Sequence, residues 1–263
     1  MAKHKEPEEL TLIQEDAELS RLGDWLPKKS NLKRNFRDFK LSACLSLIEL
    51  AISAVFIGFL YRTVIVNNRS NLLFYGLSAL KYLLEIFIVI VIVFKIEKRH
   101  LGSIGLRNFK KENLLFGREI FWTTFFGALA IIGIVLIFLL RPPKTLELGK
   151  LFLQGFYLLL CVALGEEVVW RGYFFSRFCR STGKFVATFL LLLLMILWHL
   201  PYHLYVSSHS GIPIFSLILF NSVSGTFLMV FLVFLSAKLI GRWNIYFAVS
   251  LHWFLDFKAF LSS

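Results

Sequence analysis

The sequence has few charged residues and few cysteines. Only 17% of its 263 residues are Asp, Glu, Lys or Arg, and 57% are hydrophobic, whereas a soluble domain is usually about 25% charged and about 45–50% apolar. This composition argues against an ordinary cytosolic protein and against an intrinsically disordered chain. The three cysteines, Cys44, Cys161 and Cys179, all lie in or beside apolar runs, where cysteine behaves as a small hydrophobic residue. They form no disulfide framework and say nothing about the redox compartment.

Residues 1–40 lack an apolar stretch, so we expect no cleavable signal peptide there. Basic side chains gather at the end of this region, at Lys28, Lys29, Lys33, Arg34, Arg37 and Lys40. Positive charge beside a membrane helix favours the cytoplasmic side. We therefore predict a polar cytoplasmic tail over residues 1–40 and one integral membrane domain over residues 41–263, with no internal repeat.

The sequence is rich in long apolar runs. A membrane-spanning helix needs about 20 mostly apolar residues, and the chain offers seven such runs. They cover residues 41–61, 72–96, 120–140, 151–178, 185–200, 214–237 and 243–260. The predicted fold class is all-α, a polytopic membrane bundle of about seven transmembrane helices.

The net charge of +12 belongs to the connections between these runs. Residues 95–118 hold seven Lys and Arg and residues 177–184 hold three, whereas residues 201–213 hold none. This alternation follows the positive-inside rule and predicts a cytoplasmic N-terminus and an external C-terminus. We read residues 99–114 as a basic amphipathic segment on the cytoplasmic surface. The excess charge thus indicates a lipid bilayer, not nucleic acid, as the partner.

Ionisable side chains inside a span are costly, and each is a hypothesis for a functional site. The fourth run contains Glu166, Glu167 and Arg171. On an α-helix Glu167 and Arg171 share a face and can pair, while Glu166 points about 100° away. The alternative is a buried salt bridge that only fixes helix packing. Two adjacent acids beside one arginine favour a catalytic role over a purely structural one.

Two further runs carry histidine. His199 precedes Pro201, which we expect to end or kink the helix, and this places His203 and His209 in a following loop. His252 and Asp256 are four residues apart and share a face, so the carboxylate is able to orient the imidazole. The alternatives are an interfacial histidine and a structural His–Asp pair.

Other charged residues in the spans read as structural. Lys81 and Glu85 are four apart and are expected to pair on one helix. Glu49 has no partner near it in sequence, and neither glutamate joins the candidate catalytic set.

The polar residues of the three runs suggest hydrolysis in a pocket shielded by helices, by one of two routes. A glutamate acts as general base with help from histidine, or His199, His252 and a carboxylate bind a divalent metal such as zinc that activates water. A non-enzymatic membrane immunity or scaffold protein is the alternative from another class. A transporter using Glu49, Glu85 and Glu166 is disfavoured because no inverted repeat is evident.

Three motifs in order, E-E-x-x-x-R at 166–171, W-H-x-P at 198–201 and H-x-x-x-D at 252–256, resemble the CAAX prenyl protease and bacteriocin-processing family, also called CPBP or Abi. The resemblance covers about residues 116–260. Its members are intramembrane endopeptidases, which implies a peptide or protein substrate at the membrane. Some trim prenylated C-terminal tripeptides, and bacterial members are linked to peptide processing or bacteriocin immunity; short loops favour a bacterial cell membrane.

The resemblance also implies roles for individual residues. Glu166 would activate water, Glu167 would be its adjacent acid, and Arg171 would orient both. His199 and His252 would complete the water site, or with Glu166 a metal site. Asp256 stands where the family has Asn or Asp, and a charged Asp is no oxyanion donor, which favours orientation of His252 or metal ligation. Met195 stands where the family often has Phe and is expected only to pack.

Overall fold

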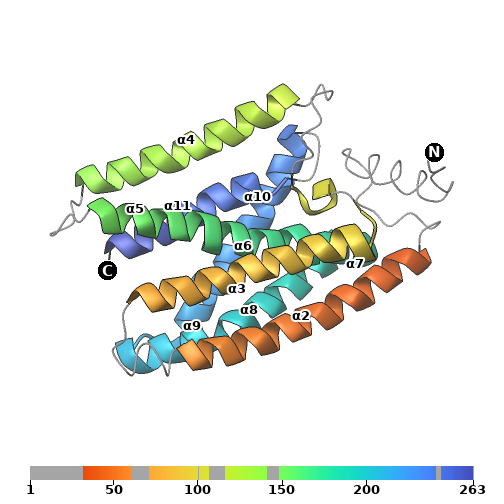
Figure 1. Ribbon diagram of the computed structural model, residues 1–263, viewed down its shortest axis with the longest axis horizontal. Coiled ribbons are helices and arrows are strands. Elements are labelled where there is room, and N and C mark those ends of the chain that lie inside the picture. The colour runs from red at the N-terminus through yellow and green to blue at the C-terminus, as the bar shows by residue number, and fades with distance from the viewer. Residues whose placement is uncertain are drawn as a thin grey trace, which may run out of the picture. The chain divides into compact units, whose positions relative to one another are not determined.

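The computed structural model describes residues 32–60, 71–99, 101–106, 116–140, 148–240 and 244–262, and no strand occurs in these ranges (Figure 1). The longer helices are α2 (Leu32–Leu60), α3 (Asn71–Val91), α4 (Phe116–Leu140), α8 (Lys184–Ser210), α10 (Ser224–Ile240) and α11 (Tyr246–Ser262). Between α4 and α8 the chain forms α5 (Leu148–Tyr157), the π-helical η5 (Leu158–Ala163), α6 (Leu164–Glu166), the π-helical η6 (Glu167–Phe175) and α7 (Ser176–Thr182). The remaining pieces are η3 (Ile92–Ile96), the 3-10 turn η4 (Leu101–Ile104), α9 (Ile214–Leu217) and η7 (Ile218–Val223). The predicted all-α class is confirmed.

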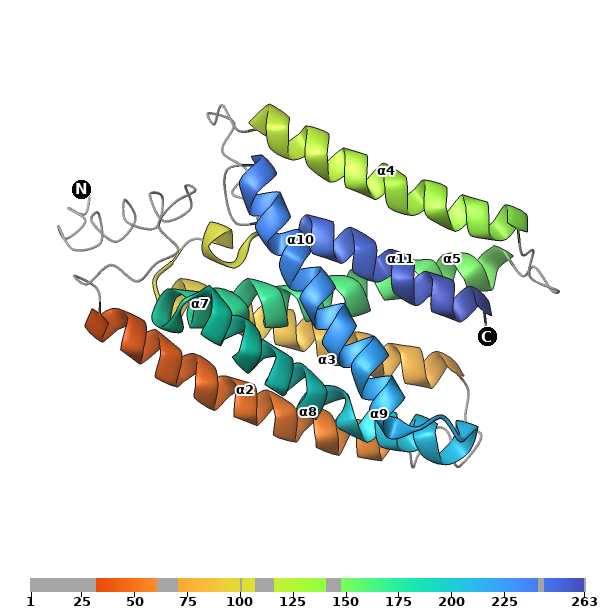
Figure 2. The same cartoon turned by 180° about the vertical axis from the view of Figure 1, so that it is seen from behind.

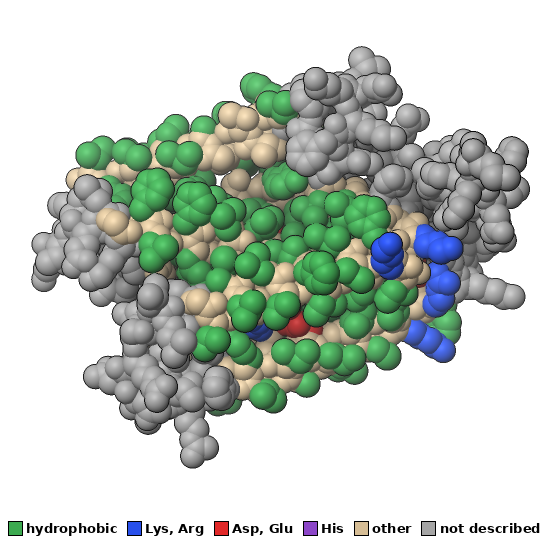
Figure 3. Space-filling view, viewed as in Figure 1, with side chains coloured by type: hydrophobic (Ala, Val, Ile, Leu, Met, Phe, Trp, Pro, Cys, Tyr) green, Lys and Arg blue, Asp and Glu red, His purple; other side chains and the backbone are tan. Residues whose placement is uncertain are grey.

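Six helical segments within these ranges are long and apolar enough to cross a membrane. They are Phe36–Phe56, Gly76–Ile96, Ile120–Leu139, Leu151–Thr182, Lys184–Ser210 and Ile214–Ile240. Each corresponds to one of the first six predicted spans, whereas the seventh prediction falls on the 17-residue α11, which is not among the six. Large apolar side chains such as Val55, Phe87 and Leu139 are exposed on these segments, and hydrophobic atoms dominate the described face seen in Figure 3. The protein is an integral membrane protein.

The described chain divides into two compact units. Unit 1 contains residues 82–173 and 232–263, and unit 2 contains residues 25–81 and 174–231, apart from the residues outside the described ranges. In unit 1, α11 packs against α4 and η5, and both cartoon views show α11 alongside α4 and α5 (Figures 1 and 2). In unit 2, α2 packs against α7 and α8.

Glycines permit close helix contacts within unit 1. A Cβ built at Gly133 of α4 would lie 2.5 Å from the Phe254 ring, and one at Gly155 would lie 3.2 Å from the Phe257 ring. Trp253 Nε1 also donates a hydrogen bond of 3.0 Å to the carbonyl oxygen of Gly155. Small residues at helix interfaces allow such approach in membranes. These contacts fix the orientation of α11, the helix that carries His252.

Helix α8 corrects the prediction at Pro201. The helix does not end there but continues to Ser210, where Gly211 at φ 71° terminates it. His203 and His209 therefore lie on the helix, not in a loop. His203 is buried, and its Nε2 lies 2.9 Å from Ser222 Oγ of η7. Membrane helices tolerate an internal proline because neighbouring groups satisfy the freed carbonyl.

The predicted surface segment 99–114 is described only at Arg99 and over residues 101–106. There it is partly interior, since the Arg99, Ser103 and Ile104 side chains are all buried. Gly172 of η6 lies against the backbone of this turn, and a Cβ added to it would be 2.6 Å from the Ile104 carbonyl oxygen.

Gly172→Ala is expected to destabilise the protein by about 1–3 kcal/mol, as overpacking usually does, because its new methyl group would meet backbone. The matched control is Gly127→Ala in α4, where nothing lies within 4 Å of the added Cβ and alanine is favoured in a helix by about 0.5–1 kcal/mol. Thermal unfolding in detergent compares the two. Equal stability of both variants would contradict this packing.

Candidate active site

Two buried glutamates lie where α6 meets η6. Glu166 is the last residue of α6 and Glu167 the first of η6, and their exposed fractions are 5% and 0%. Arg171 Nη1 donates a hydrogen bond of 3.0 Å to Glu167 Oε1. The predicted Glu167–Arg171 pair is confirmed, although the segment is π-helical and not α-helical. Short π-helical segments occur often at functional sites.

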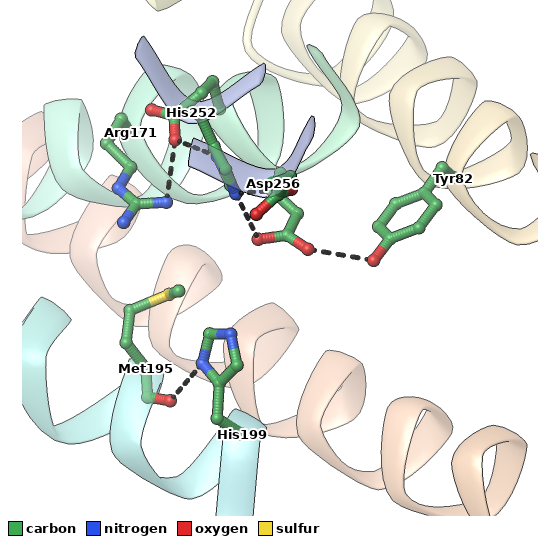
Figure 4. A network of polar contacts seen from close by, with 8 residues as sticks. Tyr82, Arg171, Met195, His199, His252 and Asp256 are labelled. Carbon is green, nitrogen blue, oxygen red and sulfur yellow. Dashed lines mark hydrogen bonds and ion pairs between the residues drawn. The ribbon is translucent and has the colours of Figure 1, made fainter. Parts of the chain in front are cut away.

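His252 of α11 faces three carboxylates (Figure 4). Its Nδ1 lies 2.9 Å from Glu167 Oε1, and its Nε2 lies 3.4 Å from Asp256 Oδ2 and 3.7 Å from Glu166 Oε2. The predicted pairing of His252 with Asp256 is therefore observed. Because ionised carboxylates only accept hydrogen bonds, this arrangement suits an imidazole that donates from both nitrogens.

The charges of this cluster do not cancel. Three carboxylates, from Glu166, Glu167 and Asp256, lie around the His252 imidazole, and Arg171 pairs with Glu167. When all three carboxylates are ionised, one negative charge is in excess even if His252 is protonated. Glu167 Oε2 and Arg171 Nε make no hydrogen bond to any residue that the structure describes. The cluster thus combines a surplus base with buried polar atoms able to bind a water or a peptide group.

Tyr82 of α3 also reaches this cluster, although no motif in the sequence indicates it. Its hydroxyl donates a hydrogen bond of 2.9 Å to Glu166 Oε1. In the sequence it is one aromatic residue in an apolar run, 84 positions before its partner. A lone tyrosine in such a run reads as packing, and only the tertiary structure brings it to the glutamate.

The order of these residues agrees with a known family. Residues 148–258 match the family model described as type II CAAX prenyl endopeptidase Rce1-like. This segment is a domain of the CAAX protease family. The resemblance of the three motifs is thereby confirmed, and the family domain contains the whole cluster except Tyr82. Residues 116–147, to which we also extended the resemblance, lie outside the matched range. No curated protein and no solved structure matches the chain.

His199, the remaining motif residue of the family domain, lies on α8 in unit 2. Its Nδ1 is 2.9 Å from the carbonyl oxygen of Met195, and its ring lies edge-on to that of Trp198 with centroids 4.6 Å apart. The Met195 side chain is buried, which agrees with the packing role expected of it. Membership of His199 in the catalytic set remains a prediction.

A second buried polar cluster in unit 2 gives Glu49 several partners, one of them four residues along the chain, although we expected none near it in sequence. Ser53 Oγ donates to Glu49 Oε1 at 2.8 Å, and Trp198 Nε1 donates to Ser53 Oγ at 2.8 Å. Lys81 Nζ lies 3.5 Å from Glu49 Oε1 and 5.3 Å from the centroid of the Trp198 ring. This cluster, Glu49, Ser53, Lys81 and Trp198, joins α2 and α3 to the residue that precedes His199.

The predicted metal ligands were Glu166, His199 and His252. No group of three or more His, Cys, Asp or Glu side chains arranged to hold a metal ion occurs in the described part of the chain. The surroundings of His252 suit an imidazole that donates hydrogen bonds from both nitrogens. Such an imidazole has no nitrogen lone pair left to bind a metal. In that state His252 does not fit as a metal ligand, whereas the ligand roles of Glu166 and His199 remain predictions, and the route proposed for this protein uses no metal.

Proposed function

We propose that this protein is an intramembrane endopeptidase in which Glu166 activates the water that hydrolyses a peptide bond near the membrane surface. The family domain supports a protease of this class. The observation that carries the role of Glu166 is its buried carboxylate, held between the Tyr82 hydroxyl and the His252 ring in a cluster with one surplus negative charge. Such a carboxylate is suited to accept a proton.

In the proposed reaction Glu166 takes a proton from water, and the resulting hydroxide attacks the carbonyl carbon of the scissile bond. The tetrahedral intermediate then collapses, the carbon–nitrogen bond breaks, and Glu166 returns the proton to the leaving amine. One water is consumed, and a new carboxylate and a new amine are formed. Carboxylates act in this double role of base and acid in hydrolases.

The neighbouring residues orient and stabilise this centre. Arg171 and His252 hold Glu167 in place and offset its charge. Asp256 orients His252 through its contact with Nε2, a role that needs no hydrogen-bond donor. A catalytic role for His199 is proposed from its place in the W-H-x-P motif alone.

The proposed substrate is a peptide segment held at the membrane. The family description names prenyl endopeptidases, and we carry over to this chain the cleavage of peptides that a lipid group or an apolar segment keeps at the bilayer. Processing of secreted peptides, including bacteriocins, in a bacterial cell membrane is the biological setting that we propose. The basic residues between Lys28 and Lys40, next to the first apolar run, support a cytoplasmic N-terminus.

Vesicle-reconstituted protein and a defined set of synthetic peptides test this function. The set contains C-terminal Cys-aliphatic-aliphatic-X peptides with and without a farnesyl group, and unmodified peptides with an apolar anchor. We expect cleavage at one bond of at least one membrane-held peptide, read by mass spectrometry. Wild-type protein that cleaves none of the set would contradict the proposal.

Metal removal separates the two hydrolytic routes. Because the proposed route uses only Glu166 and its neighbours, dialysis against a strong zinc chelator is expected to leave the cleavage rate unchanged. The measurement compares the rate before dialysis, after dialysis and after zinc is restored. A loss of activity that zinc restores would contradict the metal-free route and favour Glu166, His199 and His252 as ligands.

A further inference from the structure

A tyrosine outside the family domain contacts the glutamate that we propose as the base. Tyr82 lies on α3, within unit 1, and its hydroxyl is the donor to Glu166 Oε1 at 2.9 Å. We propose that Tyr82 is a positioning residue that fixes the Glu166 carboxylate for reaction with water. This inference rests on the proposed function.

The two oxygens of Glu166 have different surroundings. Oε1 accepts the Tyr82 hydrogen bond, while Oε2 faces His252 Nε2 at 3.7 Å, a distance too long for a hydrogen bond. Without the tyrosine the carboxylate is free to rotate about its terminal bond, since that torsion has a broad energy profile. The hydrogen bond to Oε1 therefore leaves Oε2, on the histidine side, to take the proton from water.

The helix that carries Glu166 has a glycine where Tyr82 approaches. A Cβ added to Gly165 would lie 2.8 Å from Tyr82 Cδ1 and 3.0 Å from Tyr82 Cβ. Cβ is attached to the backbone of α3 and Cδ1 belongs to the ring, so a methyl group at position 165 would displace the ring or shift α3. The absence of a side chain at Gly165 thus gives Tyr82 room to reach Glu166, the proposed base, which directly follows Gly165 in the sequence.

A second tyrosine provides a structural control. The Tyr173 hydroxyl donates a hydrogen bond of 3.1 Å to the buried carboxylate of Glu97, so it makes the same kind of contact within the same unit. Glu97 belongs to no part of the proposed catalytic cluster. Removing either hydroxyl costs one tyrosine–glutamate hydrogen bond, but only Tyr82→Phe removes one from the proposed base.

The experiment measures kcat and KM for wild type, Tyr82→Phe, Gly165→Ala, Tyr173→Phe and Glu166→Gln, with the synthetic peptide of the set above that wild type cleaves fastest. We expect Tyr82→Phe to lower kcat about ten- to hundred-fold, the size of one hydrogen bond to a charged group, with KM unchanged. Gly165→Ala keeps the hydroxyl but displaces the ring, and it should lower kcat in the same way. Tyr173→Phe should keep the wild-type kcat.

The outcomes distinguish this inference from the function on which it rests. A Tyr82→Phe variant with wild-type kcat, beside an inactive Glu166→Gln variant, would overturn the positioning role and leave the proposed function standing. Equal losses of kcat in Tyr82→Phe and Tyr173→Phe would also overturn it, because the effect would then be general to the fold. An active Glu166→Gln variant, or a wild type that cleaves no peptide, would overturn the proposed function and the inference together.

Discussion

Glu166→Gln is expected to lower kcat for peptide cleavage by about 10²–10⁴-fold, the usual contribution of a general acid or base. The amide retains the size of the side chain and an oxygen that accepts the Tyr82 hydrogen bond, but it cannot take a proton from water. The variant should therefore fold and insert like wild type. Cleavage rates in vesicles, divided by the amount of folded protein, give the measurement.

The matched control for this variant is Glu49→Gln. Glu49 is also a buried glutamate in a membrane helix, with an exposed fraction of 8%, and it also accepts a hydrogen bond from a neighbouring hydroxyl, that of Ser53. It lies in unit 2 and outside the proposed catalytic set. Its variant is expected to cleave at the wild-type rate per folded molecule. Full activity in Glu166→Gln, or equal losses in both variants, would contradict the assignment of Glu166 as base.

Arg171→Met is expected to destabilise the protein by about 3–5 kcal/mol, the cost of leaving a buried charge without its partner. The guanidinium and Glu167 are both almost completely buried, with exposed fractions of 2% and 0%, and Nη1 lies 3.0 Å from the carboxylate. Removing the cation raises the excess negative charge of the cluster by one. Chemical or thermal unfolding in detergent measures the loss.

The double variant Glu167→Gln/Arg171→Met separates stability from catalysis. Replacing both charges removes the unpaired carboxylate, so most of the lost stability should return. Cleavage should not return, because the neutral amide at position 167 no longer supplies the charge that holds His252 through Nδ1. A double variant that is stable and fully active would show that the pair only fixes helix packing. A double variant as unstable as Arg171→Met would contradict the electrostatic origin of the effect.

The helices could be predicted from apolar runs because a membrane helix satisfies its own backbone hydrogen bonds and exposes apolar side chains to lipid. Exceptions arise where tertiary contacts override local signals. Pro201 was expected to end or kink α8 and to leave His203 in a loop, but the helix continues past it to Ser210 and contains His203. Arg99 was expected at a surface, but it is buried and its Nε lies 3.6 Å from Glu97 Oε2.

The candidate site shows the same division between local and long-range information. The pairs Glu167–Arg171 and His252–Asp256 were predictable because residues four apart share a helix face. The contact of His252 with Glu167 joins residues 85 positions apart, and no spacing rule indicates it. The hydrogen bond from Tyr82 and the contact of Lys81 with Glu49 were missed for the same reason. Ser53, in contrast, is four residues after Glu49 and shares its helix face, so that hydrogen bond was predictable.

The source of the oxygen in the new carboxylate shows whether Glu166 activates water. Wild type and Glu166→Gln are incubated with the cleaved peptide in ¹⁸O-labelled water, and the mass of the new C-terminus is measured after a single turnover. If Glu166 activates water, the wild-type product gains one ¹⁸O atom in its new carboxylate and the folded variant forms no labelled product. Labelled product from Glu166→Gln at the wild-type rate, or unlabelled product from wild type, would contradict the account.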